Sequence, residues 1–228
     1  MISCQPLGEL TKYQLDHHDR VSSIERWNQG KPYSQMRYWW LTEGKAAGNL
    51  KAYGLWDASN QLIYSKQFTH DERGNVIREV LEGNLTGASS NEAYATERTF
   101  LPVFNVVTEE ISGDGLKIEC RYKEGAHLLI AKYKSTHQCF AREFFDYDRF
   151  ANVTRHIVDN GSGTAPEDLT DVTIRTITET EPVVVSLSPA FGKPQKVRKK
   201  YWENGQEHLL SLIEYRYDER GHPTQEEI

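Results

Sequence analysis

Histidines and paired carboxylates are the residues of this 228-residue chain whose types could support metal or acid–base chemistry. Imidazole and carboxylate groups are good ligands for transition metals, so the run His17-His18-Asp19 is the best metal candidate. Adjacent side chains diverge in a turn, and a turn is the structure that this run predicts. We therefore expect no metal site and no cofactor.

Asp146 and Asp148 form the best acid–base candidate. Two positions apart on a strand, they would share one face, as a general acid and a general base require. Asp148 also falls in a turn pattern that recurs along the chain, which leaves Asp146 as an exposed strand carboxylate. The sequence contains no Gly-x-Ser-x-Gly, phosphate-loop, His-Glu-x-x-His or Cys-x-x-Cys motif. We expect no catalytic residue and no enzyme activity.

The recurring pattern is a large residue, an aspartate, two or three turn residues and a β-branched or apolar run. Aspartate accepts hydrogen bonds from backbone N–H groups two residues on, and glycine or asparagine supplies the positive φ that a tight turn needs. Ala151 stands where two copies have glycine, which predicts a slightly different turn there. We predict structural turn roles for Asp16, Asp57, Asp71, Gly74, Asn75, Asp148, Asn152, Asp218 and Gly221.

Between these turns, alternating apolar and polar residues predict antiparallel strands nearly throughout. Abundant aromatic residues in a chain of mean hydropathy −0.67 are typical of a thin β structure, in which aromatic side chains supply the buried area. We predict an all-β fold of antiparallel hairpins in a curved or spiralled sheet, a partial β-shell. Residues 1–228 would form a single segment, with loops near 83–99 and 160–170.

The net charge of −6 gives no reason to expect nucleic acid or an anionic membrane as a partner. No apolar run approaches the roughly 18 residues of a transmembrane helix. The start, Met1-Ile2-Ser3-Cys4, lacks the basic and apolar regions of a signal peptide. We expect a chain that is cytoplasmic as synthesised, with export by a route that needs no signal peptide as the alternative.

Three cysteines do not make a disulfide framework. In consecutive hairpins, Cys120 and Cys139 would lie on strands separated by one other strand, about 9–10 Å apart. That separation exceeds the Cα reach of a disulfide, about 7 Å. We expect Cys4, Cys120 and Cys139 to be reduced thiols.

The repeats resemble the YD repeats of bacterial RHS proteins, which are similar to the YD shell of teneurins and of insecticidal toxin-complex proteins. The resemblance covers most of the chain, apart from the loops near 83–99 and 160–170 and the segment 182–194. It departs from the pattern where Thr69-His70 replaces the usual aromatic residue and where Lys123 replaces an aspartate after Tyr122. It is carried by Gly48-Asn49-Leu50, Asp57-Ala58-Ser59-Asn60-Gln61-Leu62 and Phe68-Thr69-His70-Asp71-Glu72-Arg73-Gly74-Asn75-Val76, and again by His127-Leu128-Leu129, Phe145-Asp146-Tyr147-Asp148 and Asn152-Val153.

This resemblance implies a long antiparallel sheet that spirals into a hollow shell and encloses a toxic polypeptide. The shell of the family usually closes with an Asp-Pro-x-Gly-Leu motif, which supports self-cleavage in many members, and this sequence has no such motif. The chain therefore looks like a piece of shell wall without its plug or its C-terminal toxin. The implied partners are another polypeptide or further RHS-repeat segments.

A second hypothesis is a β-rich surface module that binds glycan or protein through exposed aromatic side chains. Its candidate residues are Trp39, Trp40 and Trp202. Trp39 and Trp40 are adjacent on a predicted strand and must point to opposite faces, so at least one can lie outside the core. The repeat favours the shell hypothesis, because it explains the aromatic residues as the layered interior of each hairpin.

Overall fold

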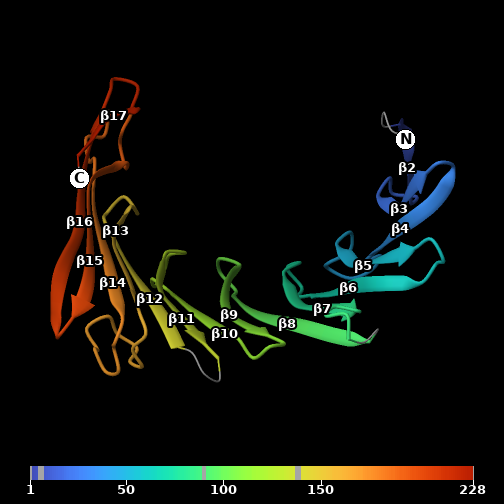
Figure 1. Cartoon of the computed structure of the whole chain (residues 1–228), viewed down its shortest axis with the longest axis horizontal. Coiled ribbons are helices and arrows are strands. Elements are labelled where there is room, and N and C mark those ends of the chain that lie inside the picture. Colours follow the sequence, from blue (N-terminus) through green and yellow to red (C-terminus); the bar gives the residue numbers. More distant parts are fainter. Residues whose placement is uncertain (1, 5–7, 89–90, 137–139, 228) are drawn as a thin grey trace. The chain divides into compact units, whose positions relative to one another are not determined.

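The computed structural model describes residues 2–4, 8–88, 91–136 and 140–227, and all regular structure within them is β-strand. The chain divides into two compact units, Met1–Asp114 and Gly115–Ile228, which we call unit 1 and unit 2. Within each unit, every strand pairs antiparallel with the next strand in chain order (Figure 1). The all-β, antiparallel fold class is confirmed. No helix long and apolar enough to cross a membrane occurs in the described ranges.

Unit 1 is a meander of nine strands. Its strands are β1 (Ile2–Cys4), β2 (Glu9–Leu15), β3 (Val21–Asn28), β4 (Lys31–Trp40), β5 (Leu50–Asp57), β6 (Leu62–His70), β7 (Val76–Gly83), β8 (Glu92–Leu101) and β9 (Val106–Ser112).

Unit 2 is a second meander, of eight strands. Its strands are β10 (Lys117–Tyr122), β11 (Leu129–Ser135), β12 (Phe140–Tyr147), β13 (Val153–Asp159), β14 (Arg175–Pro182), β15 (Pro194–Glu203), β16 (Gln206–Tyr217) and β17 (Pro223–Glu227).

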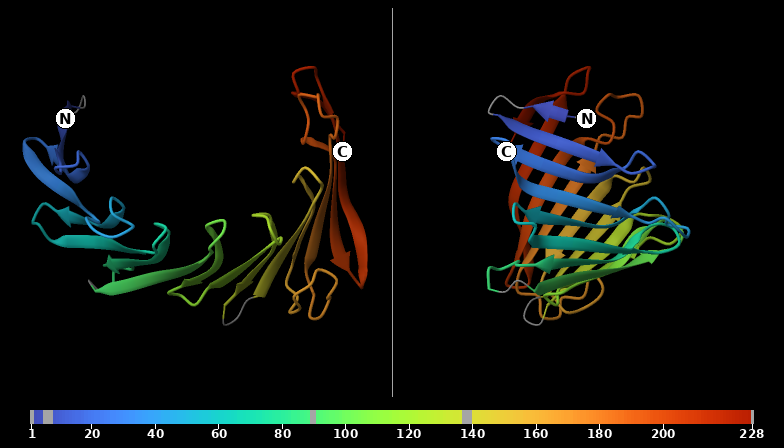
Figure 2. Two further views of the ribbon diagram at one scale, coloured as in Figure 1. Left: turned by 180° about the vertical axis from the view of Figure 1, so that it is seen from behind. Right: turned by 90° about the vertical axis from the view of Figure 1, so that its right-hand side faces the viewer.

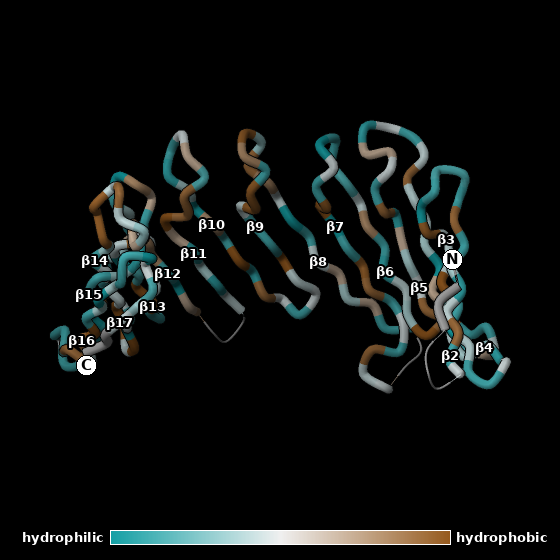
Figure 3. The backbone as a smooth tube through the Cα atoms, turned by 90° about the horizontal axis from the view of Figure 1, so that it is seen from above, coloured by the Kyte–Doolittle hydropathy of each residue, from teal (hydrophilic) through white to brown (hydrophobic). Residues whose placement is uncertain are grey.

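The strands follow the period-2 pattern of the sequence, because successive side chains of a strand point to opposite faces. In β12, Arg142 and Phe144 are buried while their neighbours along the strand are less buried. Hydrophobic and hydrophilic residues alternate along the chain in both units (Figure 3). Side-chain alternation thus selects strands, and the turn residues decide where each one ends.

The loop expected near 83–99 is shorter than predicted, because β8 already begins at Glu92. Residues 92–97 pair with β7 in a register that runs from Arg78↔Glu97 to Gly83↔Glu92. Backbone hydrogen bonds make this pairing, and they form even where the side chains are not those typical of strands. The Glu92 carboxylate also accepts hydrogen bonds from the backbone N–H groups of Leu85 and Thr86, at 2.6 and 2.7 Å. Among the described residues of this range, only 84–88 and 91 lie outside strands. By contrast, residues 160–174 form a loop that includes the whole range expected near 160–170.

Unit 1 uses partly buried aromatic side chains as its apolar layer. The ring of Tyr53 lies 6.2 Å from Tyr38, 6.3 Å from Tyr64 and 6.1 Å from Phe68, measured between centroids. Such centroid distances are typical of favourable aromatic pairs. All four rings remain partly accessible to solvent, as expected for a face that no second layer covers completely.

Unit 2 has a fully buried core. Ile157 and Ile177, each 1 % exposed, lie directly opposite one another on β13 and β14. Phe144 pairs with Ile157 from the other side, and Tyr133 and Ala131 continue the cluster on β11. Two loops, residues 160–174 and 183–193, extend from opposite ends of these strands (Figures 1 and 2).

Cys120 lies in β10, and β11 separates that strand from β12. Cys139 lies outside the described residues, so the expected separation between Cys120 and Cys139 stays a prediction. The structure describes the backbone of Cys4 but not its side chain. The expectation that residues 1–228 act as a single repeat segment likewise stays a prediction.

Candidate functional site: five aspartate turns and two aromatic hollows

The five predicted aspartates occupy five turns of the same hydrogen-bond geometry. In each turn, one carboxylate oxygen, Oδ1, accepts hydrogen bonds from the backbone N–H groups two and four residues further on. The donors and distances are His18 and Arg20 for Asp16 (2.8 and 3.0 Å), Ser59 and Gln61 for Asp57 (2.8 and 2.8 Å), Arg73 and Asn75 for Asp71 (2.8 and 2.9 Å), Phe150 and Asn152 for Asp148 (2.8 and 2.9 Å), and Arg220 and His222 for Asp218 (2.9 and 2.7 Å).

The backbone closes each turn in the same way as well. The aspartate N–H donates to the carbonyl four residues on, and its own carbonyl accepts from the N–H three residues on. For Asp71 these bonds involve Asn75, at 3.0 Å, and Gly74, at 3.1 Å. The residue before each aspartate then pairs across the hairpin with the residue five positions after that aspartate. In the Asp71 turn, His70 pairs in this way with Val76. A register shift precedes every one of these pairs.

The second carboxylate oxygen, Oδ2, binds the side chain of the last turn residue in four of the five copies. Asn75 and Asn152 each donate Nδ2–H to their aspartate at 2.9 Å. Arg20 donates Nε–H to Asp16 at 2.8 Å, and the ring Nδ1 of His222 lies 3.2 Å from Asp218. Asparagine, arginine and histidine thus perform one task at equivalent positions, because each carries an N–H at suitable reach.

These bonds favour the ionised carboxylates of Asp16, Asp71, Asp148 and Asp218 by lowering the pKa of each. At Asp16, partial desolvation acts to raise the pKa, but hydrogen bonds from Arg20 and His18 outweigh it and hold the pKa at about 2. The Asn75 side chain lowers the pKa of Asp71, and the Asn152 side chain lowers that of Asp148. The backbone N–H of His222 lowers the pKa of Asp218. A lowered pKa suits a hydrogen-bond acceptor and not a general acid.

The fourth residue of each turn has a positive φ. Gly74 and Gly221 adopt φ values of 86° and 79°, a region that glycine enters without steric cost. Asp19 and Asn60 occupy the equivalent positions at 60° and 59°. Ala151 also does so, at 65°, and its turn keeps the hydrogen bonds of the other copies. The different turn expected there does not form, and alanine instead bears the strain.

Lys123 marks a departure from the pattern. Its backbone N–H donates to the carbonyl of Leu128, five residues on, at 2.8 Å, and Gly125 supplies the positive φ of 69°. This turn is one residue longer than the aspartate turns and has no carboxylate at its first position. The five aspartate turns thus share a length that the Lys123 turn does not have.

The acid–base and metal candidates do not assemble into a site. Asp148 lies in its turn, beyond the end of β12, and both of its carboxylate oxygens are engaged, whereas Asp146 is exposed on the strand. The rings of His17 and His18 do not diverge as expected, since their centroids lie 4.0 Å apart. Within the described ranges, no three His, Cys, Asp or Glu side chains are grouped so that they could hold a metal ion.

Two of the three predicted aromatic residues line hollows. Trp40 borders an apolar hollow of about 380 Å³ in unit 1, together with Val21 and Tyr38, and its indole N–H donates to the Val21 carbonyl at 2.9 Å. Trp202 borders a more polar hollow of about 500 Å³ in unit 2. Trp39 is 44 % exposed and packs against Trp56 instead, with ring centroids 5.7 Å apart.

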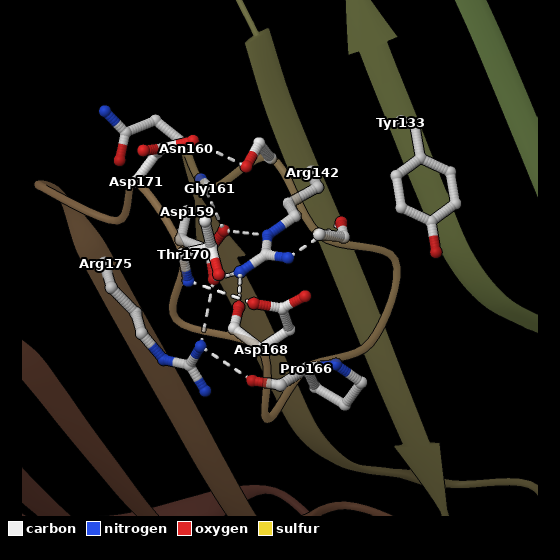
Figure 4. A network of polar contacts seen from close by, with 12 residues as sticks. Tyr133, Arg142, Asp159, Asn160, Gly161, Pro166, Asp168, Thr170, Asp171 and Arg175 are labelled. Atoms are coloured by element: carbon white, nitrogen blue, oxygen red, sulfur yellow. Dashed lines mark hydrogen bonds and ion pairs between the residues drawn. The ribbon is translucent and has the colours of Figure 1, made fainter.

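Sequence reasoning missed a buried ionic network in unit 2 (Figure 4). Arg142 on β12 and Arg175 on β14 lie opposite Asp159 on β13, and all three side chains are almost completely buried. Asp159 contacts Arg142 Nε through Oδ1 and lies 3.0 Å from Arg175 Nη1 through Oδ2. The period-2 pattern of the sequence could have indicated that Arg142 is buried, because it places Arg142 on the same strand face as Phe144.

The network holds loop 160–174 against the sheet. Arg142 donates to the carbonyl oxygens of Gly163 at 2.8 Å, Ala165 at 3.3 Å and Asp168, and Arg175 donates to that of Pro166 at 2.9 Å. Burial acts against the attraction of Asp159 and lowers the pKa of Arg175. The two guanidinium groups thus satisfy loop carbonyls that would otherwise be buried without partners.

No protein-family model matches the chain, and no curated protein matches it. Among solved structures, it is similar to a porin-like protein from Bacteroides uniformis, with 7 % identity, a TM-score of 0.38, and coverage of 90 % of this chain and 87 % of that one. It is also similar to the Photorhabdus luminescens Tc holotoxin pore carrying the TccC3-D651A mutation. There the identity is 11 % and the TM-score 0.24, and the match covers 99 % of this chain but only 15 % of the toxin chain. Neither likeness is close enough to assign a function.

Proposed function

We propose that this chain is a non-catalytic structural segment of an RHS/YD-repeat shell, which helps to enclose or display another polypeptide. The observation that carries the proposal is the fivefold recurrence of one turn, with the same carboxylate hydrogen bonds, the same positive φ and the same closing pair. Recurrence at this level indicates a repeat protein, in which each unit stacks on its neighbours. The sequence resemblance to YD repeats supplies the identity of the repeat.

The chemistry of the turn aspartates supports a structural role. Their Oδ1 atoms are saturated by backbone N–H groups, and the lowered pKa values at Asp16, Asp71, Asp148 and Asp218 keep those carboxylates ionised. General acid catalysis would need a raised pKa and a free proton. The residues that recur in this chain therefore build the structure, and the proposal includes no enzyme activity and no cofactor.

A polypeptide partner is supported by the tip of loop 183–193. Val184, Val185 and Leu187 are 57, 64 and 95 % exposed there. The loop itself is anchored, since Val183 N–H donates to the Lys193 carbonyl at 2.9 Å. Contiguous exposed apolar side chains on an anchored loop favour contact with another protein surface. Further repeat segments or an enclosed chain are the partners that we propose.

Solution mass tests this function. We expect size exclusion with light scattering to give a defined assembly above the 26.3 kDa of one chain, or a stable complex with a co-expressed neighbouring polypeptide. The variant Leu187→Glu should weaken that assembly. Val103→Glu is the matched control, because Val103 is 78 % exposed in unit 1 and belongs to no such loop. A monodisperse monomer that binds no co-expressed polypeptide would contradict the proposal.

A further inference from the structure

Unit 2 contains a hollow that the repeat does not explain. It has a volume of about 500 Å³ and lies between the end of loop 160–174 and the hairpin of β15 and β16. Thr173 lines it on the loop side, and Tyr201, Trp202, Glu203 and Asn204 line it on the hairpin side. A volume of this size falls within the range of small-molecule sites, roughly 300–1,000 Å³.

The loop side of the hollow is fixed before any ligand arrives. The Asn160 Oδ1 atom accepts hydrogen bonds from the backbone N–H groups of Thr173, at 3.0 Å, and Ile174, at 2.9 Å. Asn160 Nδ2–H donates to Thr173 Oγ1 at 2.7 Å. The buried Arg142 and Arg175 hold the rest of the loop (Figure 4). A ligand that binds against this side would therefore lose little free energy to the ordering of the loop.

The hairpin side is equally well defined. Asn204 and Gly205 have φ values of 51° and 81°, as the two central residues of a type I′ hairpin turn require. Glu203 pairs with Gln206 across this turn. Tyr201, the preceding residue of β15, also borders the hollow, but its ring lies on the opposite strand face from that of Trp202 and stacks on His208 with centroids 5.3 Å apart. The Trp202 ring is therefore carried by a closed hairpin and not by a mobile loop.

The polar groups at the hollow are available to a ligand. The side chains of Glu203 and Asn204 are exposed and have no hydrogen-bond or ion-pair partner among the described residues. The Trp202 indole N–H likewise has no partner within the described part of the chain. The Thr173 hydroxyl accepts from Asn160 and keeps its own proton to donate. The hollow thus presents donors, a carboxylate acceptor and aromatic surface together.

We propose that this hollow binds a neutral oligosaccharide. One face of a sugar ring is apolar and packs against an aromatic ring, while its hydroxyl groups both donate and accept hydrogen bonds. The unpaired Glu203 carboxylate disfavours an anionic ligand, because two like charges would meet in the site. The neighbouring Glu207 does not change this balance, since Lys200 lies 3.3 Å from it. This binding site goes beyond the proposed shell function and does not depend on it.

Indole NMR signals of the full chain test the proposal directly. The five tryptophans give five indole N–H cross-peaks in ¹⁵N-labelled protein, and Trp202→Phe identifies that of Trp202. Cellotriose, maltotriose and chitotriose would each be titrated to about 10 mM, which detects millimolar dissociation constants. We expect at least one of them to shift the Trp202 signal in a saturable way and to leave the Trp39 and Trp40 signals in place.

Two variants and a control complete the test. Trp202→Ala should weaken binding at least about tenfold, or 1.4 kcal/mol. Glu203→Gln should weaken it less and leaves the hairpin intact, so it serves if Trp202→Ala disturbs folding. Trp39→Ala, in unit 1, should have no effect. The proposal is overturned if none of the three sugars shifts the Trp202 signal, or if the shifts occur at Trp39 or Trp40.

Discussion

Units 1 and 2 contain the same aspartate turns but bury their residues differently. Of the residues that the structure describes, every fully buried apolar side chain lies in unit 2. The buried positions of unit 1 are small or polar, such as Ser23, Gly54 and Thr96. Unit 1 relies on half-exposed aromatic rings, whereas unit 2 covers its sheet with loop 160–174. A repeat can thus specify a sheet without specifying a core, because a core needs a second layer.

Loops outside the repeat supply that second layer in unit 2. Loop 183–193 lies over two of the aspartate turns: Phe191 packs against Phe150 with ring centroids 5.0 Å apart, and Lys193 Nζ donates to the Gly221 carbonyl at 2.6 Å. The segments that fall outside the sequence resemblance are therefore those that stabilise this unit. Substitutions that separate the loop contribution from the repeat contribution would test this comparison.

The largest effect is expected from removing the centre of the buried network. Asp159→Ala leaves Arg142 and Arg175 buried without their counter-charge, and loss of one partner of a buried ion pair costs about 3–5 kcal/mol. Urea unfolding, followed by the indole signals of Trp202 in unit 2 and Trp56 in unit 1, should show a large loss of stability in unit 2.

The matched control for this variant is Glu181→Ala. It breaks the ion pair of Arg198 with Glu181, whose carboxylate side chain is 56 % exposed, on strands of the same unit. An exposed pair contributes only about 0–1 kcal/mol. If Asp159→Ala lowered the stability of unit 2 no more than this control does, the network would not be what holds the loop.

Two equivalent glycines should differ in their tolerance of alanine. At Gly74 the strain of a positive φ applies, about 1–2 kcal/mol, and an added Cβ would meet only the flexible Asn49 side chain, at 2.9 Å. At Gly221 the same strain applies, and the Cβ would also lie 2.6 Å from the carbonyl oxygen of Pro189 in loop 183–193. Gly221→Ala should therefore lower the unfolding free energy more than Gly74→Ala. Equal losses would indicate that the loop adapts freely.

Acid should destabilise both units through the turns that they share. The folded state lowers the pKa of Asp16 from 3.8 to about 2, so this carboxylate stabilises the protein above pH 3.8 and loses that effect as the pH falls toward 2. The lowered pKa of Asp148 acts in the same direction in unit 2. Thermal melts across this range should show a falling Tm.

The variant Asp148→Asn tests whether the Asp148 carboxylate contributes to the loss of stability in acid. The amide retains an oxygen that can accept the turn hydrogen bonds, but it does not titrate. The variant should be less stable than the wild type at neutral pH and should lose less stability in acid. A variant with an unchanged acid dependence would mean that other groups control it.

The smallest effect expected is a gain in stability. Ala151→Gly relieves the left-handed strain of about 1–2 kcal/mol, less the roughly 0.5–1 kcal/mol of extra chain entropy that glycine loses on folding. We expect a net stabilisation of about 0.5–1 kcal/mol in urea unfolding. Asp19→Gly, at the equivalent position of unit 1, is the control and should change stability little, because aspartate tolerates this conformation. If Ala151→Gly lowered the free energy of unfolding, Ala151 would not be strained in this conformation.

Local sequence patterns specify the fold class and the location of the turns. The period-2 alternation and the aspartate pattern are local signals, and the hydrogen bonds of each turn join residues no more than four positions apart. Ala151 shows the limit of this local reading, because the flanking strands and Asp148 hold it in a conformation that alanine alone would avoid.

Which residues form a core and which border a hollow depends on tertiary packing. Arg142, Asp159 and Arg175 are 16 to 33 positions apart in the sequence and meet because three strands align in register. Trp202 and Thr173 border one hollow although they are far apart in the sequence, because the buried network holds loop 160–174 against the sheet. A turn can set the register of its own hairpin, but no local pattern of residues encodes how a long loop packs over the strands.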